Sequence, residues 1–138
     1  MLTARDIMTE NVVTIPPSCS VGHAIELLIQ EQISGLPVVD ANDQLVGIVT
    51  EFALLATAYD DSITTESVDQ HMTTDVLTVD VDDAVRKVAD LFIVHRVRRV
   101  PVMEKGRIAG LISRRDVLKA VYEGSSNLNG ASSVTFGR

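Results

Sequence analysis

Cysteine and aromatic residues are scarce in this sequence. It contains one cysteine, Cys19, no tryptophan, three phenylalanines and two tyrosines among 138 residues. A single cysteine excludes an internal disulfide and favours a reducing compartment. No apolar run approaches the ~20 residues of a membrane-spanning helix, and the first residues show no secretory signal pattern. We therefore expect a cytoplasmic protein with no membrane span and a core of Val, Ile and Leu.

Basic residues are almost missing from the first part of the chain. Residues 1–83 contain fifteen acidic residues and one basic residue, Arg5, whereas residues 84–138 contain four acidic and eleven basic residues. The net charge of −7 therefore hides a division between an acidic and a basic half. This division is consistent with two solvated surfaces of opposite sign. It is equally consistent with a basic half that gathers cations around an anionic ligand.

The residue patterns of common enzyme sites are missing too. His23, His71 and His95 are scattered without metal-ligand spacing, and Cys19 has no evident partner base. The sequence also lacks a glycine-rich phosphate loop and a nucleophile elbow. We predict no catalytic residue, no metal site and hence no enzyme. Nucleic-acid binding is disfavoured, because the chain is acidic overall and has few aromatic side chains on which bases could stack.

What the sequence does contain is a tandem repeat. The segments that recur at an offset of sixty-four residues are 6–9 as 70–73, 12–15 as 76–79 and 36–39 as 100–103. After a shortening by one residue in the intervening turn, 46–50 recurs as 109–113. A repeat of this regularity indicates duplication of one structural unit.

Each copy has the same predicted order of elements. The order is a short helix (4–8 and 67–72), a brief strand (12–15 and 76–79), an amphipathic helix (19–31 and 82–95), two strands joined by a tight turn, and a closing helix (51–58 and 114–122). Apolar strands with helices to cover them predict an α/β (α+β) fold. It would consist of two pseudo-symmetric repeats, each a small β-sheet flanked by helices.

The predicted boundaries follow from this order. We assign residues 1–60 to the first repeat, 61–66 to a linker, 67–122 to the second repeat and the Ser/Asn/Gly-rich stretch 123–138 to a flexible tail. A half of about 60 residues is marginally stable alone. We therefore expect the sheets of the two copies to pack together about a pseudo-twofold axis and to leave two related clefts.

The ordered motifs resemble a known family. In the second copy, Val100-Pro101-Val102 is followed by a turn, by Gly110-Leu111-Ile112-Ser113 and, three residues after the serine, by Asp116. This pattern, in tandem over residues 1–122, is similar to the cystathionine-β-synthase (CBS) domain pair, or Bateman module. The resemblance implies a stand-alone regulatory module that binds an adenine nucleotide in an inter-repeat cleft and pairs into a flat dimer.

The resemblance also implies a binding site in the second copy. Asp116 would hold the ribose diol through charge-assisted hydrogen bonds, and Ser113, at a helix N-terminus, would contact phosphate. Four arginines would supply cations, and the adenine would lie against the first strand and the proline-containing strand. The implied site residues are Leu77, Thr78, Arg98, Arg99, Val100, Pro101, Ser113, Arg114, Arg115 and Asp116.

A purely structural role explains the same serine and acid. Ser113 and Asp116 have the spacing of a capping box, in which each side chain accepts a hydrogen bond from the other residue's backbone. The two roles are compatible within one protein, and the sequence leaves both open.

The first copy departs from the binding pattern. Ala53 stands where the acid belongs, Ser34 and Gly35 replace the arginine pair, and Glu51 would repel a phosphate. We therefore predict one nucleotide site per chain. The degenerate first-repeat counterpart comprises Thr14, Leu36, Pro37 and Thr50.

Several ligands and one other function class stay open. The arginines favour AMP, ADP or ATP over S-adenosylmethionine, which has no phosphate, while NAD is a further alternative. Binding would change the angle between the repeats and alter what a homodimer presents to a protein partner. The alternative function is a dimerisation or protein-interaction scaffold without nucleotide binding. Its subunit contact would be formed by helix faces bearing Leu54, Leu55, Val117 and Leu118.

Overall fold

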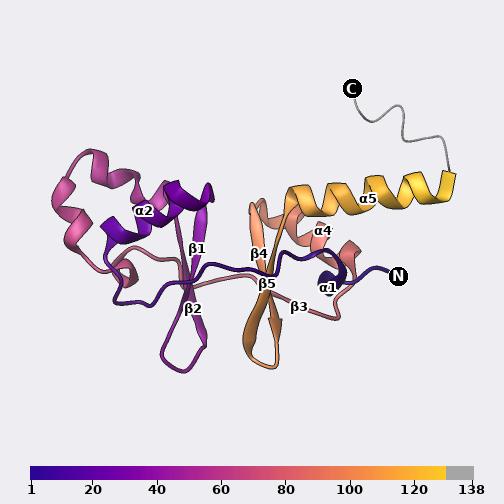
Figure 1. The fold of residues 1–138 in the computed structure, drawn as a ribbon, viewed down its shortest axis with the longest axis horizontal. Coiled ribbons are helices and arrows are strands. Elements are labelled where there is room, and N and C mark those ends of the chain that lie inside the picture. The colour runs from indigo at the N-terminus through magenta and orange to yellow at the C-terminus, as the bar shows by residue number, and fades with distance from the viewer. Residues whose placement is uncertain (130–138) are drawn as a thin grey trace. The chain divides into compact units, whose positions relative to one another are not determined.

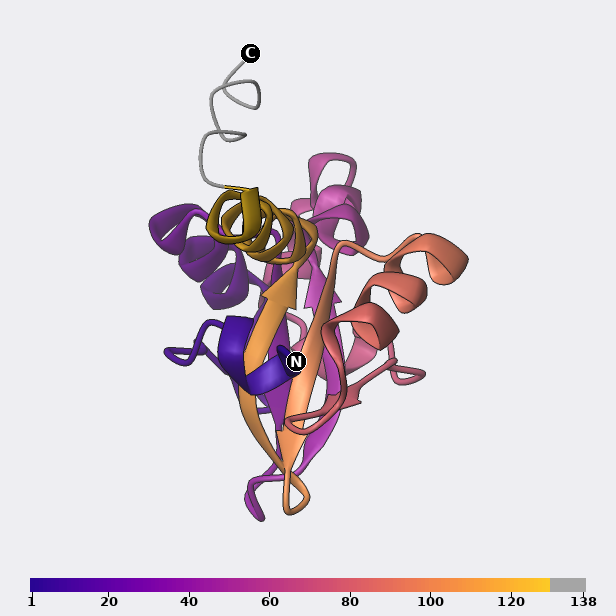
Figure 2. The same ribbon diagram turned by 90° about the vertical axis from the view of Figure 1, so that its right-hand side faces the viewer.

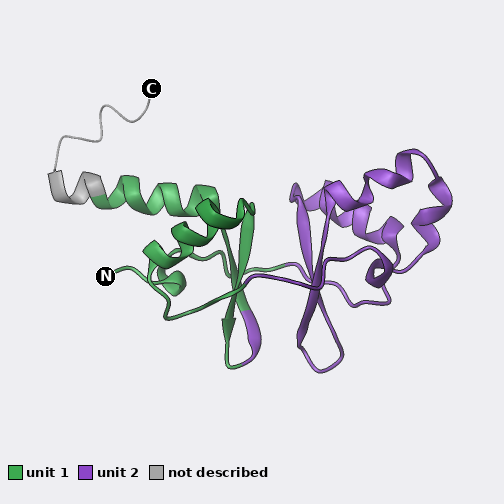
Figure 3. Cartoon of the chain, turned by 180° about the vertical axis from the view of Figure 1, so that it is seen from behind, with its two compact units in different colours: residues 1–12, 78–105, 109–138 green, residues 13–77, 106–108 purple. Residues whose placement is uncertain are grey.

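The computed structural model describes the backbone of residues 1–129 and the side chains of residues 1–124. The chain forms two compact units, which Figure 3 colours separately. Unit 1 comprises residues 1–12, residues 78–105 and the described chain from residue 109 onward, and unit 2 comprises residues 13–77 and 106–108. Each unit is therefore assembled from both halves of the sequence.

Unit 1 is built around a sheet with the strand order β3-β4-β5 (Figure 1). Its strands are β3 (Val79–Asp80), β4 (Arg99–Glu104) and β5 (Arg107–Ser113), the last of which belongs to unit 1 from Ala109 onward. Its helices are α1 (Ala4–Ile7), α4 (Val85–His95) and α5 (Arg114–Asn129). Figure 1 shows α1, α4 and α5 on one side of this sheet, and Figure 2 looks onto that side of the unit. The hairpin turn, Lys105-Gly106, has φ values of 53° and 79°. Two positive φ values are what a two-residue type I′ turn requires, and glycine adopts one without strain.

Unit 2 repeats this plan around β1 (Gly35–Val39) and β2 (Leu45–Thr50), which pair antiparallel. Ile15 forms a parallel bridge to Val38, the position equivalent to the β3–β4 pairing of unit 1. The helical segments are α2 (Val21–Glu31), α3 (Glu51–Leu54), η1 (Leu55–Ala58), η2 (Asp61–Thr65) and η3 (Val68–Gln70). The β1–β2 turn is held by Asp40, whose Oδ1 accepts hydrogen bonds from the backbone N–H groups of Asn42 and Gln44, both at 2.9 Å.

The segment that follows the first short helix of each repeat pairs with the sheet of the other repeat. Thr9 and Leu111 exchange two backbone hydrogen bonds of 2.8 and 3.0 Å, and Thr73 and Ile48 exchange two of 2.8 and 2.9 Å. These crossings are so close that a Cβ added at Gly110 would lie 2.8 Å from the carbonyl oxygen of Thr9. In each repeat, the glycine of the second hairpin strand therefore lies where a backbone segment of the other repeat passes.

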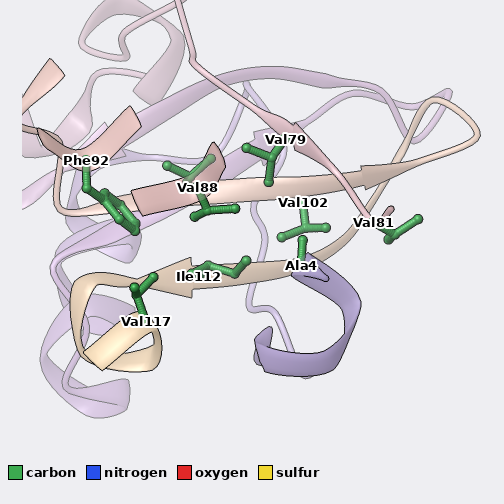
Figure 4. Packing of buried hydrophobic residues seen from close by; sticks show 9 residues of the cluster. Ala4, Val79, Val81, Val88, Phe92, Val102, Ile112 and Val117 are labelled. Atoms are coloured by element: carbon green, nitrogen blue, oxygen red, sulfur yellow. The ribbon is translucent and has the colours of Figure 1, made fainter. Parts of the chain in front are cut away.

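Each unit is held together by an aliphatic core of its own. In unit 1 (Figure 4) the buried side chains come from α1, all three strands, the turn after β3, α4 and α5. They are Ala4, Val79, Val81, Val88, Phe92, Val100, Val102, Ile112 and Val117. Unit 2 buries Ile15, Val21, Ala24, Leu28, Leu36, Val38, Val49, Leu54 and Val68. Burying one such Val, Leu or Ile side chain contributes about 1.5–3 kcal/mol. The expectation of an aliphatic core is confirmed.

Two residues of the expected subunit contact lie in these cores instead. Leu54 is 3% exposed and Val117 is 9% exposed. The prediction that both lie on an outward helix face is therefore wrong, whereas their neighbours Leu55 and Leu118 do point outward, at 60% and 68% exposure.

Several predicted elements differ in extent. The predicted strand 12–15 is reduced to the bridge at Ile15, and the predicted helix 51–58 divides into α3 and η1. The stretch expected to be a linker carries η2. The last helix continues to Asn129 rather than ending near residue 122. The rest of the expected flexible tail, 130–138, lies outside the described residues.

Candidate functional site

The strand topology of unit 1 brings the expected site residues to one end of its sheet. Because β3 runs parallel to β4, both strands begin at the same end. The antiparallel partner in the hairpin, β5, ends there and leads directly into α5. The segments at this end of the sheet are 98–101 and 113–116, and Thr78 directly precedes β3. They include every second-repeat residue of the expected site except Leu77, which belongs to unit 2.

Ser113 and Asp116 form a reciprocal capping box at the start of α5. Oδ2 of Asp116 accepts hydrogen bonds from the backbone N–H of Ser113 at 2.8 Å and from its hydroxyl at 3.1 Å. The backbone N–H of Asp116 donates to Oγ of Ser113 at 3.3 Å. Both residues are half-buried. The capping interpretation of the sequence is confirmed, and the carboxylate is fixed at the first turn of α5.

The same capping box recurs at α1, where the sequence analysis missed it. Oδ2 of Asp6 accepts from the backbone N–H of Thr3 at 2.8 Å and from its hydroxyl at 3.1 Å. These hydrogen bonds to the charged form hold the pKa of Asp6 below its ordinary value. The spacing Thr3-x-x-Asp6 was the available signal. Unit 1 thus contains two capping acids that each accept this pair of hydrogen bonds at 2.8 and 3.1 Å, of which only Asp116 lies at the expected site.

The arginines of the site differ in their surroundings. Arg114 is turned toward the end of α4: its Nε donates to the carbonyl oxygen of Val97 at 2.9 Å, and its Nη2 to that of Arg96 at 3.0 Å. Arg98 and Arg115 are exposed, and Arg99 is half-buried as the first residue of β4. The guanidinium of Arg114 therefore ties the α4–β4 loop to α5, a role that the sequence did not indicate.

The residues expected to contact the adenine lie in β4 and directly before β3. Val100 and Pro101 are buried in β4, and the next residue, Val102, pairs with Val79 of β3. Leu77, half-buried, and Thr78, exposed, immediately precede β3. Leu77 is the last residue of its segment in unit 2, and the remaining nine expected residues belong to unit 1.

The first-repeat counterpart has the same frame without the acid. Thr50 ends β2 and caps α3, where its Oγ1 accepts from the backbone N–H of Ala53 at 3.2 Å. Ala53 has no side-chain acceptor with which to return that hydrogen bond. Leu36 and Pro37 are buried in β1, and Thr14 is exposed next to the bridging Ile15. This end of unit 2 therefore lacks both the carboxylate and the cations of unit 1.

Two other features, a metal site and a membrane-spanning helix, are absent from the described residues. Within residues 1–129 there is no group of three His, Cys, Asp or Glu side chains that could hold a metal ion. Across the same described stretch, no helix combines the length and apolarity that a membrane crossing demands. Burial raises the pKa of the Cys19 thiol, so that it is less readily ionised.

Comparison with known proteins identifies the repeat. The CBS domain family model matches residues 4–59 and again residues 67–123. The chain is 30% identical over 115 residues to uncharacterized protein MJ1225 of Methanocaldococcus jannaschii, and 37% identical over 117 residues to inosine-5'-monophosphate dehydrogenase of the same organism. These alignments cover 83% and 84% of this chain but 41% and 23% of the two relatives. The chain therefore spans less than half the length of these relatives.

Solved structures show the same architecture. CBSX2 in complex with AMP superposes with a TM-score of 0.82 at 31% identity, covering 91% of this chain and 99% of CBSX2. The CBS domain pair of protein MJ0100, in complex with 5'-methylthioadenosine and S-adenosyl-L-methionine, superposes with a TM-score of 0.78 at 25% identity, covering 91% and 98%. The predicted α+β fold of two CBS repeats is confirmed. On two family matches that together span most of its length, the chain belongs to the CBS domain family as a tandem pair of CBS repeats.

Proposed function

We propose that this chain is a regulatory ligand-binding module whose second repeat binds an adenine nucleotide at Ser113–Asp116. The observation that carries the proposal is the half-buried Asp116 carboxylate, held at the first turn of α5 at the sheet end where the other expected site residues gather. A carboxylate has about four acceptor positions. Asp116 therefore accepts ribose hydroxyls while its Oδ2 keeps the capping hydrogen bonds.

The start of α5 supports phosphate recognition. This helix is sixteen residues long, and backbone N–H groups at the N-terminus of such a helix, together with its dipole, favour an anion. Exposed Arg98 and Arg115 add positive charge at the same end of the sheet. These groups favour AMP, ADP or ATP over S-adenosylmethionine, which brings no phosphate to neutralise.

The ligands of related proteins agree with an adenosyl ligand. One related structure contains AMP, and another contains 5'-methylthioadenosine and S-adenosyl-L-methionine. All three molecules carry the ribose that a carboxylate recognises, and only AMP carries phosphate. We therefore place AMP, ADP and ATP first, and S-adenosylmethionine or NAD second.

The first repeat is proposed to be unoccupied. Its Ala53 removes the charge-assisted hydrogen bonds of the ribose, a loss worth about 1.5–3 kcal/mol, or roughly 10- to 150-fold in affinity. Glu51 places an exposed negative charge beside the cap. The module would act through a homodimer on a protein partner. The change in the angle between the repeats and the cytoplasmic location stay predictions.

Calorimetric titration tests this function. Purified protein is titrated with AMP, ADP, ATP, NAD and S-adenosylmethionine, and the titrations are repeated with Asp116→Ala. We expect a phosphate-bearing adenine ligand to bind the unmodified chain and to lose at least tenfold in affinity in the variant. Asp6→Ala is the matched control, because it removes a capping acid with the same two hydrogen bonds from the same unit and should leave affinity unchanged.

The possible failures point to different conclusions. Equal losses in both variants would mean that Asp116 acts only by stabilising unit 1. An unchanged affinity in Asp116→Ala would place the ligand elsewhere on the chain. Binding of none of the five ligands would contradict the sensor function and favour the scaffold alternative.

A further inference from the structure

The side chain of Arg114 is committed to a loop of unit 1. Its Nε donates to the carbonyl oxygen of Val97 at 2.9 Å, and its Nη2 donates to that of Arg96 at 3.0 Å. Nε and Nη2 lie on one edge of the planar guanidinium, so a single edge bridges two consecutive carbonyl groups. An edge of this kind is what an arginine uses to hold a phosphate in two parallel hydrogen bonds. In Arg114 this edge is already occupied by the protein.

The loop that Arg114 holds, residues 96–98, connects the end of α4 to the start of β4. Arg96 ends α4 in the left-handed conformation, with φ 55° and ψ 30°, and its N–H donates to the carbonyl oxygen of Phe92 at 3.0 Å. Carbonyl groups at the C-terminus of a helix carry partial negative charge, which a guanidinium stabilises. Because Arg114 is the first residue of α5, and α4 packs against α5, the loop is fixed by the start of a second helix.

The loop leads directly to two arginines of the proposed phosphate site. Arg98, which is exposed, follows the carbonyl group that Nε of Arg114 holds, and Arg99 is the first residue of β4. A long side chain loses rotational freedom when it binds, and a mobile backbone beneath it would add to that loss. Holding residues 96 and 97 therefore favours phosphate binding by the residues that come next.

The first repeat has the same loop without this side-chain contact. Gln32, the counterpart of Arg96 at the offset of sixty-four, also has φ 55°. The counterpart of Arg114 is Glu51, whose ionised carboxylate has no hydrogen to donate to a carbonyl group. The backbone N–H of Glu51 donates instead to the carbonyl oxygen of Ser34 at 3.0 Å. The fold of the loop therefore does not need the arginine, which is present only in the repeat that has a pair of arginines after the loop.

We propose that Arg114 is a positioning residue for phosphate recognition, which holds residues 96–98 so that Arg98 and Arg99 contact the phosphate and is not itself a phosphate ligand. The inference rests on the nucleotide site of the proposed function and changes the role of one of its residues. The guanidinium acts through its two carbonyl partners. A lysine has the same charge but lacks the planar fork that bridges them.

A pair of ligands that differ only in phosphate tests this role. AMP and adenosine are titrated by calorimetry into the unmodified chain, Arg114→Lys and Arg114→Ala. We expect both variants to lose about tenfold in affinity for AMP, the loss of roughly one charge-assisted hydrogen bond, and to bind adenosine as the unmodified chain does. Full AMP affinity in Arg114→Lys would show that only the charge matters and would overturn the proposal. Equal losses for AMP and adenosine would overturn it too, because Arg114 would then support the whole site.

Combination with Arg98→Ala separates an indirect role from a direct contact. If Arg114 acts through Arg98, the double variant Arg98→Ala, Arg114→Ala should lose less AMP affinity than the two single losses predict together. Losses that add in full would mean that each arginine contacts the phosphate independently, and would overturn the proposal.

Hydrogen exchange of the unliganded protein tests the contact without a nucleotide. Peptides that cover residues 96–99 should exchange their amide hydrogens faster in Arg114→Ala and in Arg114→Lys than in the unmodified chain. Arg115→Ala is the matched control, because it removes the same charge from the next, exposed residue and should leave this exchange unchanged. Circular dichroism checks that all variants are folded.

The two measurements distinguish failure of the inference from failure of the proposed function. Nucleotide binding by the unmodified chain, with unchanged loop exchange in Arg114→Ala, would reject the positioning role alone. If the unmodified chain binds neither AMP nor ATP, the nucleotide site is rejected and the phosphate role of Arg114 with it, whatever the exchange shows. Faster loop exchange together with a selective loss of AMP affinity is the result that the proposal predicts.

Discussion

The two repeats of this chain share a fold but differ in the cap of the helix that follows the hairpin. In unit 1, Ser113 and Asp116 exchange three hydrogen bonds, whereas in unit 2 Thr50 accepts a single one from Ala53. Unit 2 nevertheless buries an equivalent core and ends its hairpin at the equivalent residue. The acid is therefore not required to form a CBS repeat. Its presence in unit 1 therefore favours a role in ligand binding in addition to capping.

The positions that both repeats share are those that the fold needs. Val49 and Ile112 are equivalent and have no exposed surface. Gly47 and Gly110 are also equivalent, and a backbone segment of the other repeat passes close to each. The positions that differ, by contrast, lie at the cap and among the surface charges. Substitutions at the shared positions should therefore affect stability more than substitutions at the positions that differ.

Truncation of the shared core should cost the most. Ile112→Ala should lower the free energy of unfolding by about 2–5 kcal/mol, because it leaves a cavity among packed aliphatic side chains. Val49→Ala removes fewer buried atoms and should cost less. Urea unfolding followed by circular dichroism measures both. Equal midpoints for Ile112→Ala and the unmodified protein would show that unit 1 does not depend on this core.

Adding a side chain at the glycines that another backbone passes should lower the free energy of unfolding somewhat less. In Gly110→Ala the new Cβ would lie 2.7 Å from Sδ of Met8 and 2.8 Å from the carbonyl oxygen of Thr9. The side chain of Met8 is flexible, but the carbonyl is held by its hydrogen bond from Leu111. We expect a loss of about 1–3 kcal/mol from overpacking.

Gly47→Ala should show a similar loss in unit 2, where Met72 and Thr73 stand at 2.6 and 2.8 Å. Gly124→Ala is the matched control, because nothing lies within 4 Å of its added Cβ. Thermal unfolding of the three variants checks the prediction, and a Gly124→Ala variant as unstable as the other two would contradict it.

Restoring the missing acid in the first repeat should complete the cap of α3. Ala53→Asp places a carboxylate where it can accept from the backbone N–H of Thr50 and complete a capping box. We expect a gain of roughly 0.5–1 kcal/mol in unfolding free energy. No second nucleotide site should appear, because Ser34, Gly35 and Glu51 leave this end without cations. Urea unfolding measures the first result and calorimetry the second.

Acid should weaken unit 1 through the carboxylates of Asp6 and Asp83. The backbone and hydroxyl hydrogen bonds of Thr3 hold the pKa of Asp6 below its ordinary 3.8, and the backbone N–H of Asp80 does the same for Asp83. A depressed folded-state pKa gives stability that is present above the unfolded-state pKa and is lost as pH falls through the folded-state pKa. Urea midpoints should therefore decline below about pH 4. A double Asp6→Asn, Asp83→Asn variant should show a shallower decline.

Much of this structure is predictable from the repeat, and the rest depends on contacts that a repeat does not encode. Hydrophobic spacing places the helices and hairpins, because Val85, Val88 and Phe92 recur at helical intervals. It does not reveal that Thr9 pairs with Leu111 of the other repeat, since a pairing partner far away in sequence leaves no local signal. The split of residues 51–58 into α3 and η1 likewise has no signal in the apolar pattern.

The candidate site shows the same division. The capping geometry of Ser113 and Asp116 is predictable because it depends on residues three apart. The contact of Arg114 with the carbonyl groups of Arg96 and Val97 is not, because it depends on how α5 packs beside the end of α4. Val117 is buried and Leu118 is exposed, although the two residues are adjacent in α5. The sequence alone did not show which of them points outward.

The most direct test of the central claim is the number of nucleotides bound per chain. Equilibrium dialysis with radiolabelled ATP or AMP, whichever binds more tightly in the titrations, measures this number at saturation for the unmodified protein. The asymmetry between the caps predicts one tight site per chain. Two sites of equal affinity would contradict it, because the repeat without the acid and the arginines would then bind as well as the repeat that has them.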